Sequence, residues 1–121
     1  LGVLDRVHFV GQLDDTELPR AYRSADVLVM PSLHEGFCLP VIEAMACGTP
    51  VVTSRGGATE ETAGGAAVLV DPYDPAAIAG GIAEAVARRD ELRRLGLERA
   101  PVFSWQAAAR ATADVYREVA R

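Results

Sequence analysis

Hydrophobic and polar positions alternate along the chain in blocks that predict strands and helices in turn. Runs of β-branched and other apolar residues, bounded by Gly, Pro or Asp, predict four short strands at residues 6–11, 26–31, 50–54 and 66–72. The run at 26–31 is continuously apolar, which is typical of a strand buried on both faces of a parallel sheet.

Helical patterns separate these runs. Residues 14–25 predict a helix that Asp14 or Asp15 can cap, and residues 39–48 predict a helix with Pro40 in its first turn. Strands and helices alternating at this spacing predict βαβ units, and hence an α/β fold with a Rossmann-like parallel sheet and flanking helices. With about four strands, we expect a partial version of that fold.

After residue 72 the pattern is helical. Ile78, Ile82 and Val86 share one helical face, although Gly80 and Gly81 each weaken that helix by about 1 kcal/mol relative to Ala. A second helical run is expected to break at Gly96. Ser104 is then expected to cap a last helix with an exposed hydrophobic face.

Composition narrows the class of protein. The 121 residues suffice for one compact domain, and 50% of them are hydrophobic. A formal charge of −5 argues against nucleic-acid binding through phosphates. No apolar run reaches the roughly 20 residues of a membrane span. With no signal peptide and no metal-ligand cluster, Cys38 and Cys47 are expected to be reduced thiols of a cytoplasmic protein.

The candidate chemistry lies in the stretch from Pro31 to Val52. Ligands of open α/β sheets bind at the carboxyl ends of strands, and here a strand leads through a loop into a helix N-terminus suited to a diphosphate. Gly36 permits close approach, and the amides that would face the ligand belong to Phe37, Cys38 and Leu39. Glu43, one turn further, could accept hydrogen bonds from a ribose diol. From these residues alone, Glu35 and Glu43 could equally be a surface acid and a capping acid.

The whole stretch "PSLHEGFCLPVIEAMACGTPVVTS" resembles the signature of the retaining glycosyltransferases of family 4, which have the GT-B fold. The signature is an E-x7-E motif framed by "EGFGLP" and "EAMACGTPVV". The segments "VHFVGQLDDTELPRAYRSADVLVMPS", "AAVLVDPYDPAAIAGGIAEAV" and "FSWQAAARATADVYREV" resemble the segments before and after it. The resemblance covers nearly all 121 residues.

This resemblance implies a hexosyltransferase with two Rossmann-like domains. The N-terminal domain binds the acceptor, and the C-terminal domain binds a nucleotide-diphosphate sugar, which is transferred with retention of anomeric configuration. Residues 1–121 resemble the later two thirds of the C-terminal domain, as a single partial domain without the acceptor domain. We therefore expect a UDP- or GDP-sugar as ligand, the acceptor domain as partner, no metal or other cofactor, and no transfer by this chain alone.

The resemblance also implies roles for individual residues. Glu43 matches the ribose-binding glutamate, and Glu35, the catalytic candidate, matches the glutamate near the donor sugar. The loop that contacts sugar and diphosphate is matched by Gly36, Phe37, Cys38 and Leu39. Weaker candidates for base contacts through backbone groups are Val10 and Gly11.

Cys38 departs from the family pattern, which usually has Gly at this position. A positive φ there would strain a cysteine, and the helix dipole could lower its thiol pKa. The basic residues that grip the diphosphate in the family have no counterpart here, and Arg55 is expected to be a solvated loop residue. His34 could line the donor site, and Glu61 is expected to cap a helix.

Two other interpretations stay open at this point. One is a noncatalytic nucleotide-binding or interaction module, and the other is a flavodoxin-like regulatory domain, for which Asp71 lacks a second acid. The strands that would lie between 6–11 and 26–31 are absent, which predicts an exposed sheet edge or a gap beside 26–31. A location of the full-length enzyme at the inner face of the membrane also stays open.

Overall fold

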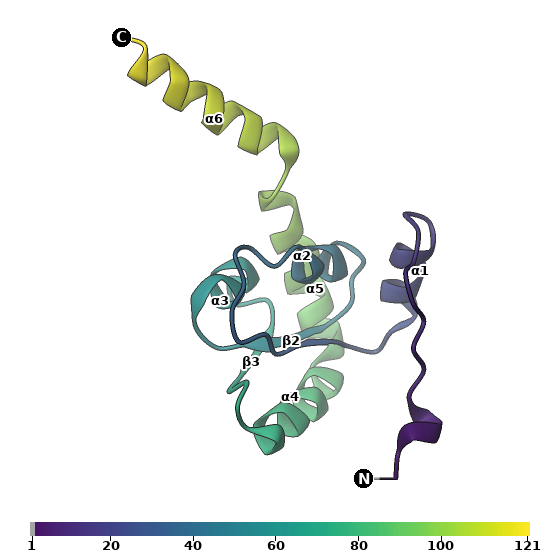
Figure 1. Cartoon of the computed structure of the whole chain (residues 1–121). Coiled ribbons are helices and arrows are strands. Elements are labelled where there is room, and N and C mark those ends of the chain that lie inside the picture. The colour runs from purple at the N-terminus through teal and green to yellow at the C-terminus, as the bar shows by residue number, and fades with distance from the viewer. Residues whose placement is uncertain (1) are drawn as a thin grey trace.

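Three parallel strands form the centre of the structure, a computed structural model that describes residues 2–121 (Figure 1). They are β1 (Leu28–Met30), β2 (Val51–Ser54) and β3 (Val68–Val70), in the order β1-β2-β3. Val29 is in register with Val52, which in turn is in register with Val68. The Rossmann-like α/β class predicted from the sequence is confirmed.

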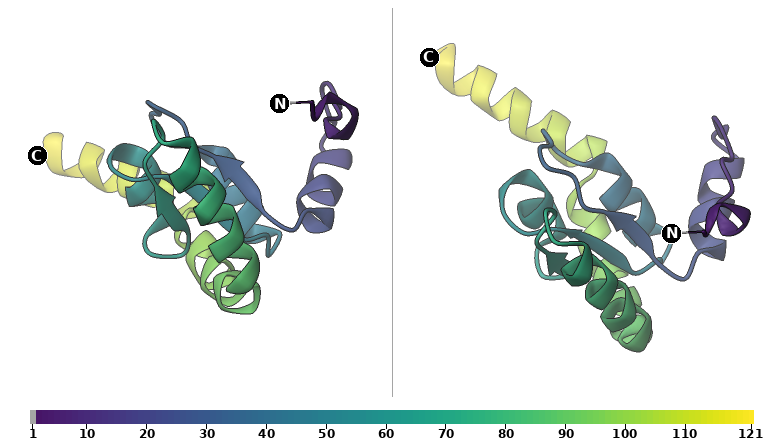
Figure 2. Two further views of the ribbon diagram at one scale, coloured as in Figure 1. Left: turned by 90° about the horizontal axis from the view of Figure 1, so that it is seen from below. Right: turned by 60° about the horizontal axis from the view of Figure 1, so that its bottom comes forward.

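Side chains alternate between the two faces of the sheet, and each face has its own hydrophobic cluster. On one face, α2 (Leu39–Ala46) packs on Val51 through Val41 and Met45, which are fully buried. On the other face, α4 (Pro75–Ala87) packs on Val52 and the two valines of β3. The views in Figure 2 show the sheet between these helices.

The remaining helices are α1 (Glu17–Ser24), α3 (Gly57–Ala63), α5 (Arg89–Arg99) and α6 (Trp105–Val119), with 3₁₀ turns at η1 (Leu4–Arg6) and η2 (Ala100–Val102). Their starts follow the sequence signals. Asp14 Oδ1 accepts from the amides of Thr16 and Glu17, and Ser104 Oγ accepts from Ala107 N at 3.1 Å. The cap predicted at Ser104 is confirmed. Of the two aspartates predicted to cap the first helix, Asp14 binds the amides at its start, although the N-cap residue itself is Thr16.

The strand predicted at residues 6–11 is wrong. Arg6 ends the 3₁₀ turn η1, residues 7–11 pair with no strand of the described chain, and the Phe9 side chain is 91% exposed. A β-branched sequence forms a strand only where a neighbour supplies hydrogen bonds, and none lies beside it here. His8, expected to be structural, is exposed. The sheet therefore has three strands within residues 2–121, where about four were predicted.

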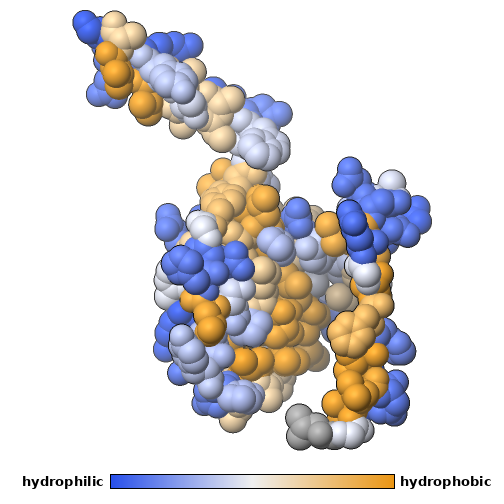
Figure 3. Space-filling view, in the orientation of Figure 1, coloured by the Kyte–Doolittle hydropathy of each residue, from blue (hydrophilic) through white to orange (hydrophobic). Residues whose placement is uncertain are grey.

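The expected exposed sheet edge is confirmed at β1. This strand is half-buried, whereas β2, between its two neighbours, is buried at every position. In Figure 3, apolar residues gather on the side of the body that faces the N-terminal segment. The burial on both faces predicted for the strand at 26–31 is therefore wrong, because β1 is an edge strand and lacks one neighbour.

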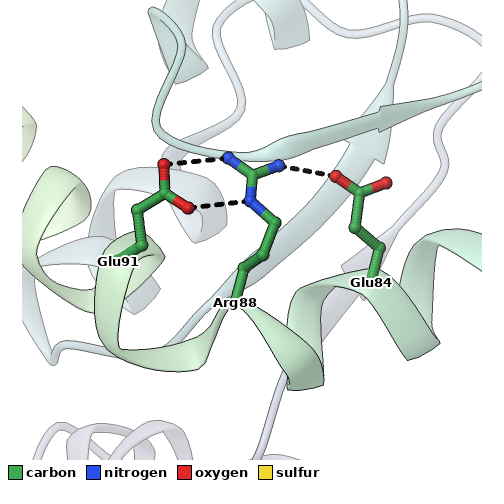
Figure 4. A network of polar contacts seen from close by, with 3 residues as sticks. All are labelled: Glu84, Arg88 and Glu91. Atoms are coloured by element: carbon green, nitrogen blue, oxygen red, sulfur yellow. Dashed lines mark hydrogen bonds and ion pairs between the residues drawn. The ribbon is translucent and has the colours of Figure 1, made fainter.

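The predicted helix break at Gly96 is wrong, because α5 continues through it. Gly96 is buried, and a Cβ there would lie 3.2 Å from Met45 Cγ. The glycine thus lets α5 approach α2 closely. At the start of α5, the guanidinium of Arg88 joins Glu84 of α4 to Glu91, with Nε 2.9 Å from Glu91 Oε2 (Figure 4). These contacts hold the pKa of Glu91 below its usual range.

The last helix projects from the body, as Figure 1 shows. Its exposed large apolar side chains include Val115, Tyr116, Val119 and Trp105, the last of which is 84% exposed. The exposed hydrophobic face predicted for this helix is confirmed. Across the described residues, no helix is both long and apolar enough to cross a membrane.

Candidate functional site

A cavity of about 160 Å³ lies at the carboxyl ends of the strands. The loop after β1 contributes His34 and Glu35, and the loop after β2 contributes Arg55 and Gly56. Pro72, which follows β3, closes the cavity from the third strand. This is the edge where open α/β sheets bind ligands, so Glu35 lies where its strand predicted.

Hydroxyl groups of β2 and its following loop hold the loop after β1 in place. Thr53 Oγ1 donates to Met30 O at 2.9 Å, and Ser54 Oγ donates to Ser32 O. Thr59 Oγ1 donates to Ser54 O at 2.9 Å and so fixes the start of α3. The cavity wall is therefore tied to the core of the sheet, and no buried side-chain N or O atom of the described residues lacks a partner.

Cys38 immediately precedes α2 and has a φ of 68°, in the left-handed region. Among the described residues, it is the one non-glycine position with a positive φ. An L-residue with a Cβ is strained by about 1–2 kcal/mol in this conformation. The position therefore has a backbone conformation that glycine adopts without strain, and the strain expected for a cysteine with a positive φ is present.

The thiol of Cys38 does not behave as the helix dipole suggested. The side chain is 4% exposed, and its Sγ lies 3.6 Å from Met30 Sδ. Burial raises the thiol pKa, and the negative charge of Glu35 adds to the increase. Desolvation of the thiolate outweighs the helix terminus, so the lowered pKa proposed from the sequence is wrong.

The Phe37 side chain packs against the segment just before α6. Its ring meets Phe103 edge to face, with 5.4 Å between centroids, and its carbonyl accepts from Thr62 Oγ1 at 2.6 Å. Together with Leu39 it lines an apolar groove of about 450 Å³ that extends along the first half of α6, from Trp105 to Ala111. The side chains of Phe37 and Leu39 therefore belong to this groove, which leaves only their backbone groups for the loop role.

Glu43 has a different neighbourhood from Glu35. Its Oε2 accepts a hydrogen bond of 3.0 Å from the phenol of Tyr22 in α1, and it does not line the Glu35 cavity. Burial first, and then the hydrogen bond to Glu43, raise the pKa of Tyr22 to about 12. The two carboxylates of the motif thus lie in separate environments, one at the cavity and one facing α1.

The weaker candidates are not brought to the cavity. Val10 and Gly11 lie in the exposed N-terminal segment, with Val10 70% exposed and Gly11 at a φ of 70°. Gly36 is exposed at the turn before Cys38, as a loop open to ligand requires. No three His, Cys, Asp or Glu residues between 2 and 121 gather in a way that could hold a metal ion.

Sequence reasoning missed three features. Arg55, expected to be solvated, is exposed but also lines the cavity with Glu35 and His34. The sequence pattern places Tyr22 on a helix face and gives its hydroxyl no role. The acid that caps α3 is Glu60, which accepts from Gly56 N, and not Glu61. Only the position of Arg55, directly after a strand, gave a signal in the sequence.

Comparisons with known proteins agree on one family. The family described as Glycosyl transferases group 1 matches residues 1–99. "D-inositol 3-phosphate glycosyltransferase 2" of Catenulispora acidiphila is 46% identical over 121 residues, covering 96% of this chain and 28% of the relative. "MMP alpha-(1->4)-mannosyltransferase" of Mycolicibacterium hassiacum is 43% identical over 125 residues, covering 98% of this chain and 30% of the relative.

A solved structure gives the same result. Sucrose-phosphate synthase from Thermosynechococcus elongatus superposes with a TM-score of 0.84 at 40% identity, over 95% of this chain and 30% of that one. The chain thus spans less than a third of the length of these proteins. With its parallel sheet and family match taken together, the chain belongs to the glycosyl transferases group 1 family.

Proposed function

We propose that this chain is the donor-binding part of a retaining glycosyltransferase of family 4, which uses a nucleotide-diphosphate sugar. One observation carries the proposal: in a chain of this family, Glu35 of the E-x7-E motif lines a cavity at the carboxyl edge of the sheet. Because the chain spans about 30% of the relatives, transfer needs the rest of the enzyme. Two of these relatives are a mannosyltransferase and a sucrose-phosphate synthase, which makes a hexose the first sugar to test.

The sugar is assigned to the Glu35 cavity. A carboxylate accepts hydrogen bonds from sugar hydroxyls, and the guanidinium of Arg55, which lines the same cavity, can donate to them. His34 adds a polar group on the same wall. A cavity of about 160 Å³ is small for a whole nucleotide sugar, so we assign only the sugar to it.

The diphosphate is assigned to the turn before α2. Gly36 is exposed there, and the left-handed backbone at Cys38 turns the chain into the helix. The first amides of a helix have no intrahelical partner and carry partial positive charge, which suits an anion. Backbone groups of Phe37, Cys38 and Leu39 are the proposed donors.

The nucleoside is assigned to the α1 side of α2, where Glu43 would accept from the ribose diol. In this arrangement, the two motif carboxylates would bind the two ends of one ligand, on either side of the helix N-terminus. Val10 and Gly11 stay candidates for the base only if the N-terminal segment moves toward this site.

Retention would follow from attack on the same face of the sugar as the leaving diphosphate. The departing phosphate oxygen takes the acceptor proton, so no protein nucleophile is needed. The protein's task is to stabilise the developing negative charge with preorganised donors, each contributing about 1.5–3 kcal/mol. Glu35 would orient the sugar hydroxyls and would not attack the anomeric carbon. Independence from metal ions is part of the same proposal.

The acceptor-binding domain is the proposed partner of the exposed apolar surface. Leu39 and Trp105 line the apolar groove, and α6 presents further apolar side chains beyond it. Surface of this kind is uncommon on a chain that works alone. A cytoplasmic location belongs to the proposal as well, because activated nucleotide sugars are made there.

An NMR titration of the isotope-labelled chain tests the proposal. UDP, GDP and ADP, each free and as hexose conjugates, are added up to millimolar concentration, with EDTA present in one series. We expect shifts from Gly36 to Glu43 for one base, unchanged by EDTA, and further shifts at Arg55 with the sugar conjugate. A folded chain that responds to none of these ligands would refute the proposal.

A matched pair of variants tests the division of the site. Glu35→Gln should weaken binding of the sugar conjugate about tenfold while leaving the free nucleotide unaffected. Glu118→Gln, on the exposed face of α6, makes the same charge change away from the cavity and should alter neither.

A further inference from the structure

We propose that Tyr22 is a positioning residue of the donor site, whose phenol holds the Glu43 carboxylate ready for the ribose hydroxyls. This inference rests on the proposed function, because it assumes that Glu43 binds the ribose. Tyr22 is outside the E-x7-E motif and lies on a different helix. The geometry that points to it is the 3.0 Å hydrogen bond between Tyr22 Oη and Glu43 Oε2.

Glu43 has few other constraints. Within residues 2–121 it takes part in no ion pair, and the Tyr22 phenol is the one side-chain donor that reaches it. Oε2 is therefore occupied, whereas Oε1 keeps its acceptor capacity. A glutamate without such a contact samples several rotamers, and a ligand that binds it must then immobilise it at a cost in conformational entropy.

Tyr22 is itself well fixed. Its ring is half-buried against the cluster that contains Val41 and Met45, and Thr49 Oγ1 donates to its backbone carbonyl at 2.7 Å. With a pKa of about 12, the phenol keeps its proton throughout the physiological range and so remains a donor. The Tyr22 phenol, held by the packing of its ring on the core, thus orients the partly buried carboxylate of Glu43.

A purely structural role would be to fasten α1 to α2. The two roles differ in what they affect. Loss of a structural link lowers the free energy of unfolding and weakens all ligands alike. Loss of positioning weakens only those ligands that offer the ribose hydroxyls to Glu43, so the affinity ratio of a ribonucleotide to its dideoxy counterpart separates them.

The test compares the affinities of UDP, GDP and ADP with those of their 2′,3′-dideoxy forms, for the wild-type chain, Tyr22→Phe and Tyr116→Phe. Tyr116 lies exposed on α6 and is the matched control. We expect the wild type and Tyr116→Phe to prefer one ribonucleotide over its dideoxy form. Tyr22→Phe should lose about fivefold in affinity for that ribonucleotide and less than about twofold for the dideoxy form.

A folded Tyr22→Phe chain with an unchanged ratio would overturn the role of Tyr22 and leave the proposed function intact. A wild-type chain that binds nucleotides without preferring ribose removes Glu43 from the donor site, and the inference fails with it. No binding at all overturns both proposals.

NMR of the chain with isotope-labelled tyrosine Cζ gives a second measurement, which follows Tyr22 in the wild-type chain. The Tyr22 resonance should shift when the ribonucleotide binds and should not shift with the dideoxy form. Equal shifts with the two ligands would contradict the inference.

Discussion

Gly81 of α4 lies directly against Val70 of β3, so that a Cβ on the glycine would clash with Val70 Cγ1. The glycine is buried, and the closest approach of α4 to the sheet depends on it. Gly80, its neighbour, has open space at the same position. From the sequence, the two glycines weaken one helix equally, whereas the structure gives them different roles.

Gly81→Ala should therefore destabilise the chain by about 1–3 kcal/mol, because the helix must move away from β3 or the valine must leave its rotamer. Gly80→Ala should stabilise it by up to about 1 kcal/mol through helix propensity alone. Urea unfolding of the two variants measures both values. Equal effects of the two substitutions would contradict the packing role of Gly81.

Cys38 allows a test of backbone strain. At most positions an alanine variant is more stable than a glycine variant. At a φ of 68°, as at Cys38, the glycine variant should be the more stable of the two. We expect Cys38→Gly to be more stable than Cys38→Ala by about 1 kcal/mol, since both lose the buried sulfur and only the glycine relieves the strain. Chemical denaturation gives the difference. An alanine variant as stable as the glycine variant would show that the backbone relaxes.

The thiol of Cys38 should react slowly with alkylating agents near neutral pH. It is buried, and both burial and Glu35 raise its pKa, so little thiolate is present or accessible. Cys47, also free and partly exposed, provides an internal comparison and should be modified first. Mass spectrometry of a time course after brief alkylation reports the order. Faster labelling of Cys38 would mean that the loop before α2 opens readily.

Much of the fold could be predicted because its signals are local. The capping groups of Asp14 and Ser104 act within three residues, and the apolar run of β2 is buried in the centre of the sheet. The strand at residues 6–11 failed for the opposite reason. Its β-branched residues satisfy the local rule, but a strand also needs a partner, and pairing is a property of the whole sheet.

The candidate site, like the fold, could be predicted from the sequence only where its signals are local. The E-x7-E spacing and the loop after β1 placed Glu35 at the edge of the sheet, where it lines the cavity. The contribution of Arg55 and the contact between Tyr22 and Glu43 come from segments brought together only by folding. No spacing in the chain encodes a hydrogen bond between residues 21 positions apart.

The Tyr22 phenol should make stability depend on pH in the alkaline range. Its folded pKa is raised to about 12 from an ordinary value of about 10, so folding favours the protonated form. Its contribution is then complete below pH 10 and is lost as the pH rises through about 12. Denaturant unfolding across this window should show a decline in the wild type that is smaller in Tyr22→Phe and unchanged in Tyr116→Phe.

Glu43→Gln separates the causes of that shift. Burial is the largest cause and persists in the variant, whereas the hydrogen bond to a charged acceptor and the electrostatic effect of Glu43 are lost. The pKa of Tyr22 should therefore fall but stay above that of an exposed tyrosine, as phenolate absorbance or tyrosine Cζ shifts can record. An unchanged titration of Tyr22 in Glu43→Gln would show that the phenol and the carboxylate are not in contact in solution, and the positioning role would fail with it.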